Sequence, residues 1–276
     1  MSTPTPLHQP RPFIKWAGGK GQLLPQYESL FPPRWTRYFE PFLGGGAMFF
    51  HLQPAWAALA DVNPALINLY RCVRDHAPEV LALLEAHQAN HCPAHYYAVR
   101  SQHQLPAIAH AARFIYLNKT CFNGLYRENL KGEFNVPMGR YKKPAICDPQ
   151  RVLAASALLQ NTELRLQDFS QIREHASRAT DFVYLDPPYH PLSNTSNFTA
   201  YSKFAFGELQ QRQLHRVFVR LAEAGVQVML SNSDCEFIRE LYQDFHVHTI
   251  SASRSINVKG THRGKINEVV VTSYPV

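Results

Sequence analysis

Residues Asp181–Tyr189 combine an apolar run with groups that could hold a planar amine. The apolar part is typical of a buried strand. Neither Pro187 nor Pro188 can donate to a sheet ladder, so the strand is predicted to end at Asp186. There, a carboxylate and an outward-facing backbone carbonyl could accept both hydrogens of a nucleobase amine, while Tyr189 stacks on its ring. Taken alone, Asp186-Pro187-Pro188 is explained equally well by a strand and a turn that have no catalytic role.

A glycine-rich stretch predicts a second ligand-binding element. Tyr38–Phe50 runs from an aromatic strand through Gly44–Gly46 into an apolar helix, as in nucleotide-binding α/β units. It lacks the G-x-G-x-x-G spacing and a following Gly-Lys-Ser/Thr, so a ligand without phosphates is favoured over a dinucleotide or a triphosphate. Asp61 ends the next predicted strand, and behind a glycine loop its carboxylate is placed to bind ribose hydroxyls. Alone, Asp61 would more often cap the helix beginning at Pro64.

The segment Phe13–Gly21 contains further candidates for ligand binding. Its glycines allow close approach of the backbone to a ligand, and Lys20 can meet a carboxylate or a phosphate. Trp16 could cover an adenine ring. The alternative is a tight turn with a tryptophan in the core.

Between Asn118 and Pro144, glycines, asparagines and aromatic residues are mixed with basic side chains. Cations bind phosphates, while Arg and Asn can read base edges, so this composition favours a DNA-reading surface over an ordinary charged loop. Asn-Gly and Lys-Gly pairs mark turns and predict a hairpin within Leu130–Val136. Five of its basic residues are Arg127, Lys131, Arg140, Lys142 and Lys143.

Bulk composition agrees with a globular protein that binds a polyanion. The chain has 276 residues, 45% hydrophobic and 18% charged, with a formal net charge of +7. Its five cysteines lack metal or redox spacing, which predicts reduced thiols in a cytosolic protein. His91–His95 is predicted to be a surface loop rather than a metal site. The polar segment Met1–Pro10 is not predicted to be a signal peptide, and no run predicts a membrane span.

The elements that position these groups follow from apolar spacing. Polar residues 193–199 are predicted to cover the site, and the basic loop 254–265 is predicted to bind phosphate. Helices are predicted at 22–30, 64–74, 208–224 and 237–242 and over most of 77–117, and further strands at 164–166, 226–232, 246–250 and 268–274.

Together, the motifs resemble the Dam-type DNA adenine methyltransferases, which use S-adenosylmethionine. The resemblance rests on Lys15–Lys20, Glu40–Gly46, Gly132–Pro137 and Asp186–Tyr189, which occur in the family's order. It implies an α/β, Rossmann-like methyltransferase core with a mixed, mostly parallel sheet and helices on both faces. It also implies a smaller, largely helical DNA-recognition subdomain with a β-hairpin. The implied boundaries are 1–75 and 145–276 for the core and 76–144 for the subdomain.

The resemblance also implies roles for individual residues. Arg127 would recognise a guanine of 5′-GATC, Asn123 would fill the gap left by an extruded adenine, and Lys15 would help at the other guanine. The implied catalytic residues are Asp186, Pro187, Pro188 and Tyr189. The implied cofactor residues are Trp16, Lys20, Glu40, Phe42, Gly44, Gly46, Asp61, Asp168 and Asp186. The implied DNA-binding residues are Lys15, Phe122, Asn123, Leu125, Arg127, Pro137, Arg140 and Tyr141.

Two other function classes stay open from the residues alone. Amino-cytosine, RNA or a protein amide could be the methyl acceptor, because each presents a planar amine. A DNA-binding module that has lost catalysis is the second alternative. The expected partner is double-stranded DNA, with no metal and no membrane. The expected protein is a cytosolic monomer, either solitary or paired with a separately encoded restriction endonuclease.

Overall fold

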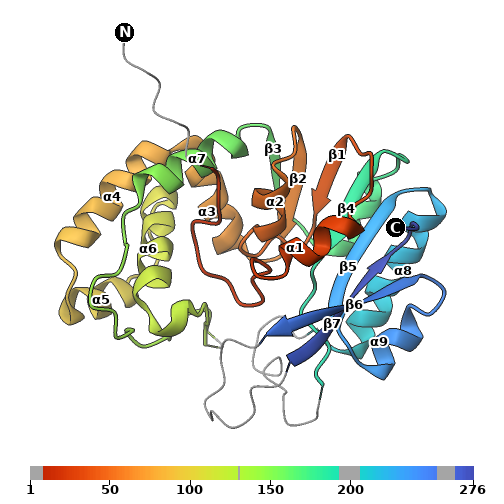
Figure 1. Ribbon diagram of the computed structural model, residues 1–276. Coiled ribbons are helices and arrows are strands. Elements are labelled where there is room, and N and C mark those ends of the chain that lie inside the picture. The colour runs from red at the N-terminus through yellow and green to blue at the C-terminus, as the bar shows by residue number, and fades with distance from the viewer. Residues whose placement is uncertain (1–8, 130, 193–205, 254–264) are drawn as a thin grey trace. The chain divides into compact units, whose positions relative to one another are not determined.

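The computed structural model describes residues 9–129, 131–192, 206–253 and 265–276 (Figure 1). The helices are α1 (Leu24–Tyr27), α2 (Ala47–Leu52), α3 (Pro64–Asp75), α4 (Ala77–Ala89), α5 (Pro93–Arg100), α6 (Ala107–Thr120), α7 (Pro149–Leu159), α8 (Glu208–Glu223) and α9 (Glu236–Leu241). The strands are β1 (Arg37–Glu40), β2 (Ala57–Asp61), β3 (Thr162–Leu166), β4 (Asp181–Leu185), β5 (Gln227–Ser233), β6 (His246–Ser253) and β7 (Lys265–Thr272). Short 3₁₀ turns are η1 (Glu28–Leu30), η2 (Phe122–Gly124) and η3 (Phe169–Glu174).

The strands form one seven-stranded sheet in the order β3-β2-β1-β4-β5-β7-β6. β1 pairs in parallel with β2 and β4, and β4 pairs in parallel with β5. β7 runs antiparallel to β5 and β6. The predicted mixed, mostly parallel α/β sheet is therefore confirmed. The strand order reverses between β1 and β4, and open α/β sheets bind ligands at the carboxyl ends of the strands at such a point.

The two strands at this reversal are almost wholly buried, which explains their apolar sequences. Arg37 opens β1 opposite Asp181 of β4, and its guanidinium donates to both oxygens of that carboxylate at 2.8 and 2.6 Å. β4 ends at Leu185, one residue before the predicted end at Asp186 and just ahead of the two prolines.

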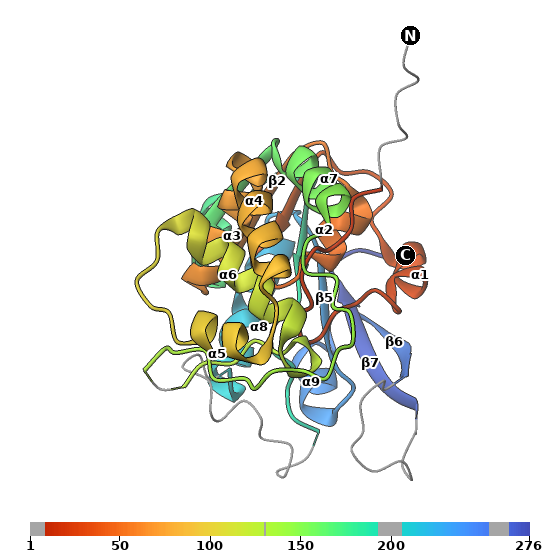
Figure 2. The ribbon, with the colours of Figure 1, turned by 90° about the vertical axis from the view of Figure 1, so that its left-hand side faces the viewer.

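The chain folds into two compact units. One comprises Met1–Gly19, Gly44–Gln53 and Asp61–Leu166, and the other comprises Lys20–Leu43, Pro54–Ala60 and Gln167–Val276. The first unit contains α3 to α6, with α6 packed against α3, α4 and α5 (Figure 2). In the second unit, α8, α9 and η3 enclose an apolar core with β4 and β5, including Phe218, Val183 and Val228.

Most predicted elements are confirmed, with shifts at their ends. The predicted helix at 22–30 is only α1 followed by η1, since Pro25 lies at its start and Pro32 soon after its end. The helical pattern at 77–117 is three helices, α4 to α6. The closing pair is β6 and β7. The prediction missed α7, which packs against α3 and α4.

Two local predictions are corrected in detail. The predicted hairpin begins before Leu130, because Glu128 pairs with Phe134, and it is an isolated bridge rather than a pair of strands in the described part of the chain. His91–His95 is not a loop throughout: Cys92 caps α5, and its sulfur accepts a hydrogen bond from the backbone N–H of His95 at 3.4 Å. The predicted cover at 193–199 lies outside the described residues, as does most of the loop 254–265. No helix in the described ranges is both long and apolar enough for a membrane span.

Candidate active site

The Asp186 carboxylate lies directly after β4 and has two close partners within the second unit. The ammonium of Lys20 is 2.8 Å from its Oδ1, and the Ser231 hydroxyl donates to the same oxygen at 2.7 Å. The Lys20 side chain is 5% exposed, whereas that of Asp186 is 23% exposed. Lys20 and Ser231 therefore bind the carboxylate, and part of the Asp186 side chain remains exposed to solvent.

Tyr189 presents its ring beside this carboxylate group. The Lys20 ammonium lies 4.6 Å from the centroid of the ring, within the range of a cation–π contact. The Tyr189 hydroxyl donates to Oε2 of Glu268 on β7 at 2.7 Å. Burial raises the pKa of Tyr189, and the charge of Asp186 raises it further. Tyr189 is thus a neutral ring anchored at its hydroxyl end.

The two proline carbonyls differ in their hydrogen bonding. The amide of Gln211 donates to the Pro188 oxygen at 3.0 Å. For the Pro187 oxygen, no hydrogen bond to another described residue is found. One carbonyl of the turn is thus fixed by α8, while its neighbour keeps its capacity to accept.

Three other predicted cofactor residues also lie in the second unit. Glu40 is buried at the end of β1, where its carboxylate accepts the Tyr38 hydroxyl at 2.8 Å. Phe42 stacks on Phe169, with ring centroids 5.3 Å apart. Asp168 caps η3 by accepting from the backbone N–H of Ser170 at 2.9 Å.

The glycine loop and Asp61 meet in the first unit. Asp61 accepts the Gly44 N–H at 3.0 Å and the Asn63 N–H at 2.9 Å. Burial raises the pKa of Asp61, and these two backbone hydrogen bonds oppose the rise. Asp61 is not the cap of α3; the Asn63 side chain is, since it accepts from Ala65 and Leu66. The alternative role for Asp61 is therefore wrong.

Trp16 is packed between this loop and an aromatic stack. An added Cβ at Gly44, where φ is +48°, would lie 2.7 Å from Cδ1 of Trp16. The indole also stacks on two aromatic rings: its centroid lies 5.5 Å from that of Tyr126 and 6.3 Å from that of Phe114. Only glycine suits this backbone, because both the dihedral and the contact exclude a side chain.

The predicted DNA-binding residues of the first unit gather around Asn118. Its side chain accepts from the Lys15 N–H and donates to the Lys15 and Gly124 carbonyls, at 2.8, 2.8 and 3.1 Å. Asn123 takes the left-handed conformation, with φ of 55°. The Lys15 ammonium lies 3.4 Å from the Tyr141 hydroxyl and over its ring. Asn118 was not among the predicted site residues, yet its side chain connects the backbone at Lys15 to the backbone at Gly124.

The remaining predicted DNA-binding side chains are exposed. Phe122 is 50% exposed and Leu125 is 39% exposed. The Phe122 N–H donates to the Pro137 carbonyl at 2.9 Å, and Arg127 donates to the Asn135 side chain at 2.7 Å. Arg140 is exposed on the same segment as Pro137.

Comparison with known proteins decides the class. A family model described as "D12 class N6 adenine-specific DNA methyltransferase" matches residues 16–256. The chain belongs to this family. The resemblance inferred from the motifs is confirmed at this level.

Curated relatives agree with this D12 class assignment along nearly the whole chain. The chain is 43% identical to "Type II methyltransferase M1.LlaDCHI" of Lactococcus lactis subsp. cremoris, covering 96% of this chain and 95% of the relative. It is 38% identical to "Type II methyltransferase M.MjaIII" of Methanocaldococcus jannaschii, covering 96% and 99%. It is 37% identical to "DNA adenine methylase" of Escherichia coli strain K12, covering 96% of each. The protein is an adenine-specific DNA methyltransferase.

The residues of this D12 methyltransferase fit S-adenosylmethionine better than a phosphate-bearing cofactor. In the first unit, Asp61 takes the Gly44 N–H and places a carboxylate beside the glycine loop, where it would repel phosphate and suit ribose hydroxyls. In the second unit, Lys20 supplies a cation suited to a carboxylate.

Four buried or half-buried polar residues of this D12 methyltransferase were missed by the sequence predictions. Gln211, Ser231, Asn232 and Glu268 all contact Asp186–His190 or one another. Two features of the sequence could have indicated these residues. Polar Ser231 and Asn232 follow an apolar run in β5, and Glu268 is an acid within the mostly apolar strand β7. Their contacts depend on the alignment of β4, β5 and β7, which a single strand does not show.

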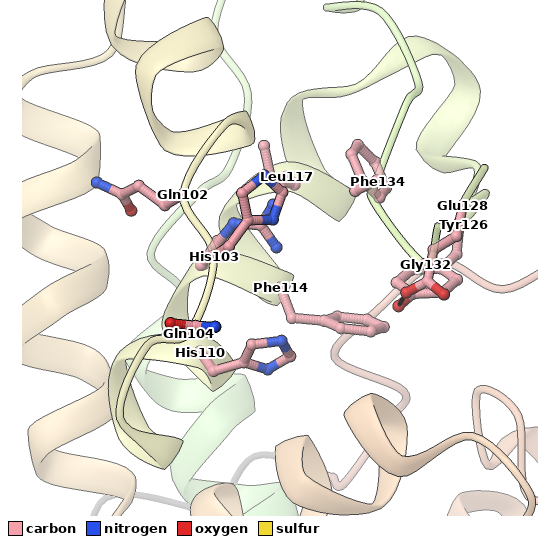
Figure 3. Close-up of a pocket in the computed structure, with 11 residues that line it drawn as sticks. Gln102, His103, Gln104, His110, Phe114, Leu117, Tyr126, Glu128, Gly132 and Phe134 are labelled. Atoms are coloured by element: carbon pink, nitrogen blue, oxygen red, sulfur yellow. Dashed lines mark hydrogen bonds between the residues drawn. The ribbon is translucent and has the colours of Figure 1, made fainter. Parts of the chain in front are cut away.

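A small cavity of about 180 Å³ lies under the hairpin of the first unit (Figure 3). The rings of Phe114, Tyr126 and Phe134 and the carboxylate of Glu128 line it. His110 also lines it and is half-buried.

Proposed function

We propose that this methyltransferase transfers the methyl group of S-adenosylmethionine to the N6 atom of adenine in duplex DNA, within 5′-GATC, after flipping the base. The position of Lys20 carries the proposal. Its ammonium is a nitrogen donor 2.8 Å from Asp186 and 4.6 Å from the Tyr189 ring centroid. An adenine stacked on Tyr189 would present its amino group in the same way.

The proposed chemistry uses the two acceptors at the end of β4. Asp186 and the Pro187 carbonyl accept the two amino hydrogens, which draws the nitrogen lone pair out of conjugation with the ring. Lys20 withdraws from Asp186 to admit the amine. S-adenosylmethionine, when bound, would supply an electrophilic methyl group; the bond from sulfur to that methyl group breaks as the bond to the adenine nitrogen forms, and S-adenosylhomocysteine is the leaving product. Positioning and preorganised charge carry most of the catalysis. Asp186 need not be a strong base, because the methylated ammonium loses its proton readily.

The proposed cofactor residues are those implied by the motifs. Trp16, Gly44, Gly46 and Asp61 lie in the first unit. Lys20, Glu40, Phe42, Asp168 and Asp186 lie in the second.

The proposed DNA-recognition subdomain is 76–144, and it lies wholly within the first unit. Arg127 would recognise a guanine, and Lys15 would help at the other guanine. Extrusion of adenine costs a few kcal/mol, and Asn123 would fill the gap that it leaves. The exposed side chains of Phe122, Leu125 and Tyr141, which lie beside basic residues, support a DNA-binding surface. Apolar side chains can contact bases, and cations can bind phosphates. We further propose a cytosolic monomer.

Transfer of a tritiated methyl group tests the proposal. Duplexes with 5′-GATC, duplexes with one changed base pair, RNA and protein would each be incubated with the enzyme and labelled cofactor. N6-methyladenine should be the labelled nucleoside, and only the 5′-GATC duplex should be labelled efficiently. Label in cytosine, RNA or protein would contradict the acceptor, and equal labelling of all duplexes would contradict the site. Digestion of cellular DNA with nucleases that distinguish methylated 5′-GATC provides the check in vivo.

A further inference from the structure

The carboxyl end of β5 lies beside the Asp-Pro-Pro-Tyr turn and is unusually polar for a buried strand. Leu185 of β4 is paired with Leu230 of β5, so the next residues along the two parallel strands are Asp186 and Ser231. Ser231 and Asn232 are both 0% exposed. Buried polar groups cost free energy unless they are fully hydrogen-bonded, so their partners indicate what they do.

Ser231 forms the middle of a directed hydrogen-bond chain. Its hydroxyl donates to Oδ1 of Asp186 at 2.7 Å, and the Tyr184 hydroxyl lies 2.9 Å from its oxygen. A serine hydroxyl has one hydrogen, so with that hydrogen on Asp186 the Tyr184 hydroxyl must be the donor to Ser231. Burial raises the pKa of Tyr184, which keeps this hydroxyl protonated. The chain runs from Tyr184 through Ser231 to the carboxylate.

Asn232 and Gln211 hold the other side of the turn. The Asn232 side-chain oxygen accepts the His190 N–H at 3.1 Å, and its amide donates to the Gln211 side-chain oxygen at 3.0 Å. Gln211 in turn donates to the Pro188 carbonyl at 3.0 Å. Both amides use oxygen as acceptor and nitrogen as donor, so the network is consistent in its directions.

We propose that Ser231 and Asn232 are positioning residues for methyl transfer, with Ser231 orienting the Asp186 carboxylate and Asn232, through Gln211, orienting the proline carbonyls. This inference rests on the proposed function of Asp186 and Pro187 as acceptors of the target amine. Gln211 fixes Pro188 and thereby the direction of the adjoining Pro187 carbonyl. The carboxyl end of β5 thus orients both proposed acceptors, the Asp186 carboxylate and the Pro187 carbonyl. A planar amine with two hydrogens requires two acceptors in fixed positions.

Ser231→Ala tests the orienting role, with Thr272→Ala as the matched control. Thr272 is a 0% exposed hydroxyl of the same sheet that donates to the Tyr274 carbonyl and does not contact the turn. Ser231→Ala should lower the single-turnover rate of methyl transfer roughly 10- to 100-fold, because misplaced reacting groups lose rates of that order. The dissociation constants for cofactor and DNA should stay within about two-fold of wild type, since the change acts on the reacting geometry. The control should retain its rate.

Two outcomes would overturn the inference: a wild-type rate for Ser231→Ala, or a loss of rate that Thr272→Ala shares. Should the alanine variant fail to fold, Ser231→Cys keeps the volume and a weaker donor, and a wild-type rate in that variant would overturn the inference equally.

A second readout is the double variant Ser231→Ala/Tyr184→Phe. Its rate should equal that of Ser231→Ala, because Tyr184 acts only through Ser231; additive losses would contradict the chain. Absence of methyl transfer by wild-type enzyme would instead refute the proposed function.

Discussion

The Lys20 ammonium lies 2.8 Å from Oδ1 of Asp186 and 4.6 Å from the Tyr189 ring centroid. These are the two groups proposed to hold the amino group and the ring of the target adenine. The lysine therefore neutralises a carboxylate whose other side-chain partner among the described residues is the uncharged Ser231 hydroxyl. In the proposed mechanism, the target amine replaces Lys20 at Asp186 and donates one hydrogen bond to Asp186 and one to the Pro187 carbonyl.

Replacing Lys20 by Met should weaken cofactor binding. The variant keeps the apolar stem but loses the cation that we propose for the cofactor's carboxylate. A hydrogen bond to a charged group contributes about 1.5–3 kcal/mol, so the dissociation constant for S-adenosylmethionine should rise roughly 10- to 100-fold. Calorimetric titration measures it, with the exposed Lys143→Met as control. Unchanged cofactor affinity would remove Lys20 from the cofactor site.

Gly44→Ala should destabilise the glycine loop. The added Cβ would lie 2.7 Å from Trp16, and φ of +48° disfavours a side chain by about 1–2 kcal/mol. The free energy of unfolding should fall by at least that amount, and cofactor affinity should fall with it. Gly21→Ala is the matched control, because an added Cβ there meets nothing within 4 Å. Equal behaviour of the two variants in urea unfolding would contradict the tight fit at Gly44.

The sequence was sufficient to predict local features with a local cause. The end of β4, predicted at Asp186 from two prolines, lies one residue earlier at Leu185, and the loop after β1 follows from three glycines. The cap of α3 was harder to assign: Asp61 and Asn63 are both good caps, and only the structure shows that Asn63 accepts from the helix while Asp61 turns to Gly44. Contacts between strands could not be predicted, because Ser231 reaches Asp186 through the register of β4 and β5.

Arg127→Ala should reduce discrimination at one base pair. The guanidinium is exposed, and its Nε donates to the Asn135 side chain at 2.7 Å. We propose that its remaining N–H groups make a bidentate contact to a guanine. Loss of such a contact costs about 1–3 kcal/mol at the base it reads. Methylation rates on duplexes with single changes in 5′-GATC measure this. Lys142→Ala, an exposed cation on the same segment, should weaken binding uniformly. A uniform loss for Arg127→Ala would make Arg127 a phosphate contact.

His87 should make stability depend on pH between about 6.5 and 4. Burial, followed by the nearby His95, lowers the pKa of His87 from 6.5 to about 4. The unfolded chain therefore binds a proton that the folded chain does not, so stability is lost as pH falls through this window. The loss attributable to His87 should be about 1–2 kcal/mol after allowance for solvent screening.

His87→Gln provides the measurement. Urea unfolding at pH 7.5 and pH 4.5 should show a smaller loss of stability in this variant than in wild type. The exposed His103→Gln should lose as much as wild type. Equal losses in all three proteins would contradict the assignment to His87.

The central claim is that Asp186 accepts the target amine, and Asp186→Ala tests it most directly. The measurement is single-turnover transfer of a tritiated methyl group to a 5′-GATC duplex, with DNA binding measured in parallel and the surface variant Asp75→Ala as control. The Asp186 variant should lose on the order of 10³-fold in rate, because it lacks the preorganised acceptor, and should still bind DNA. The control should match wild type. Methyl transfer by Asp186→Ala at the wild-type rate would contradict the claim.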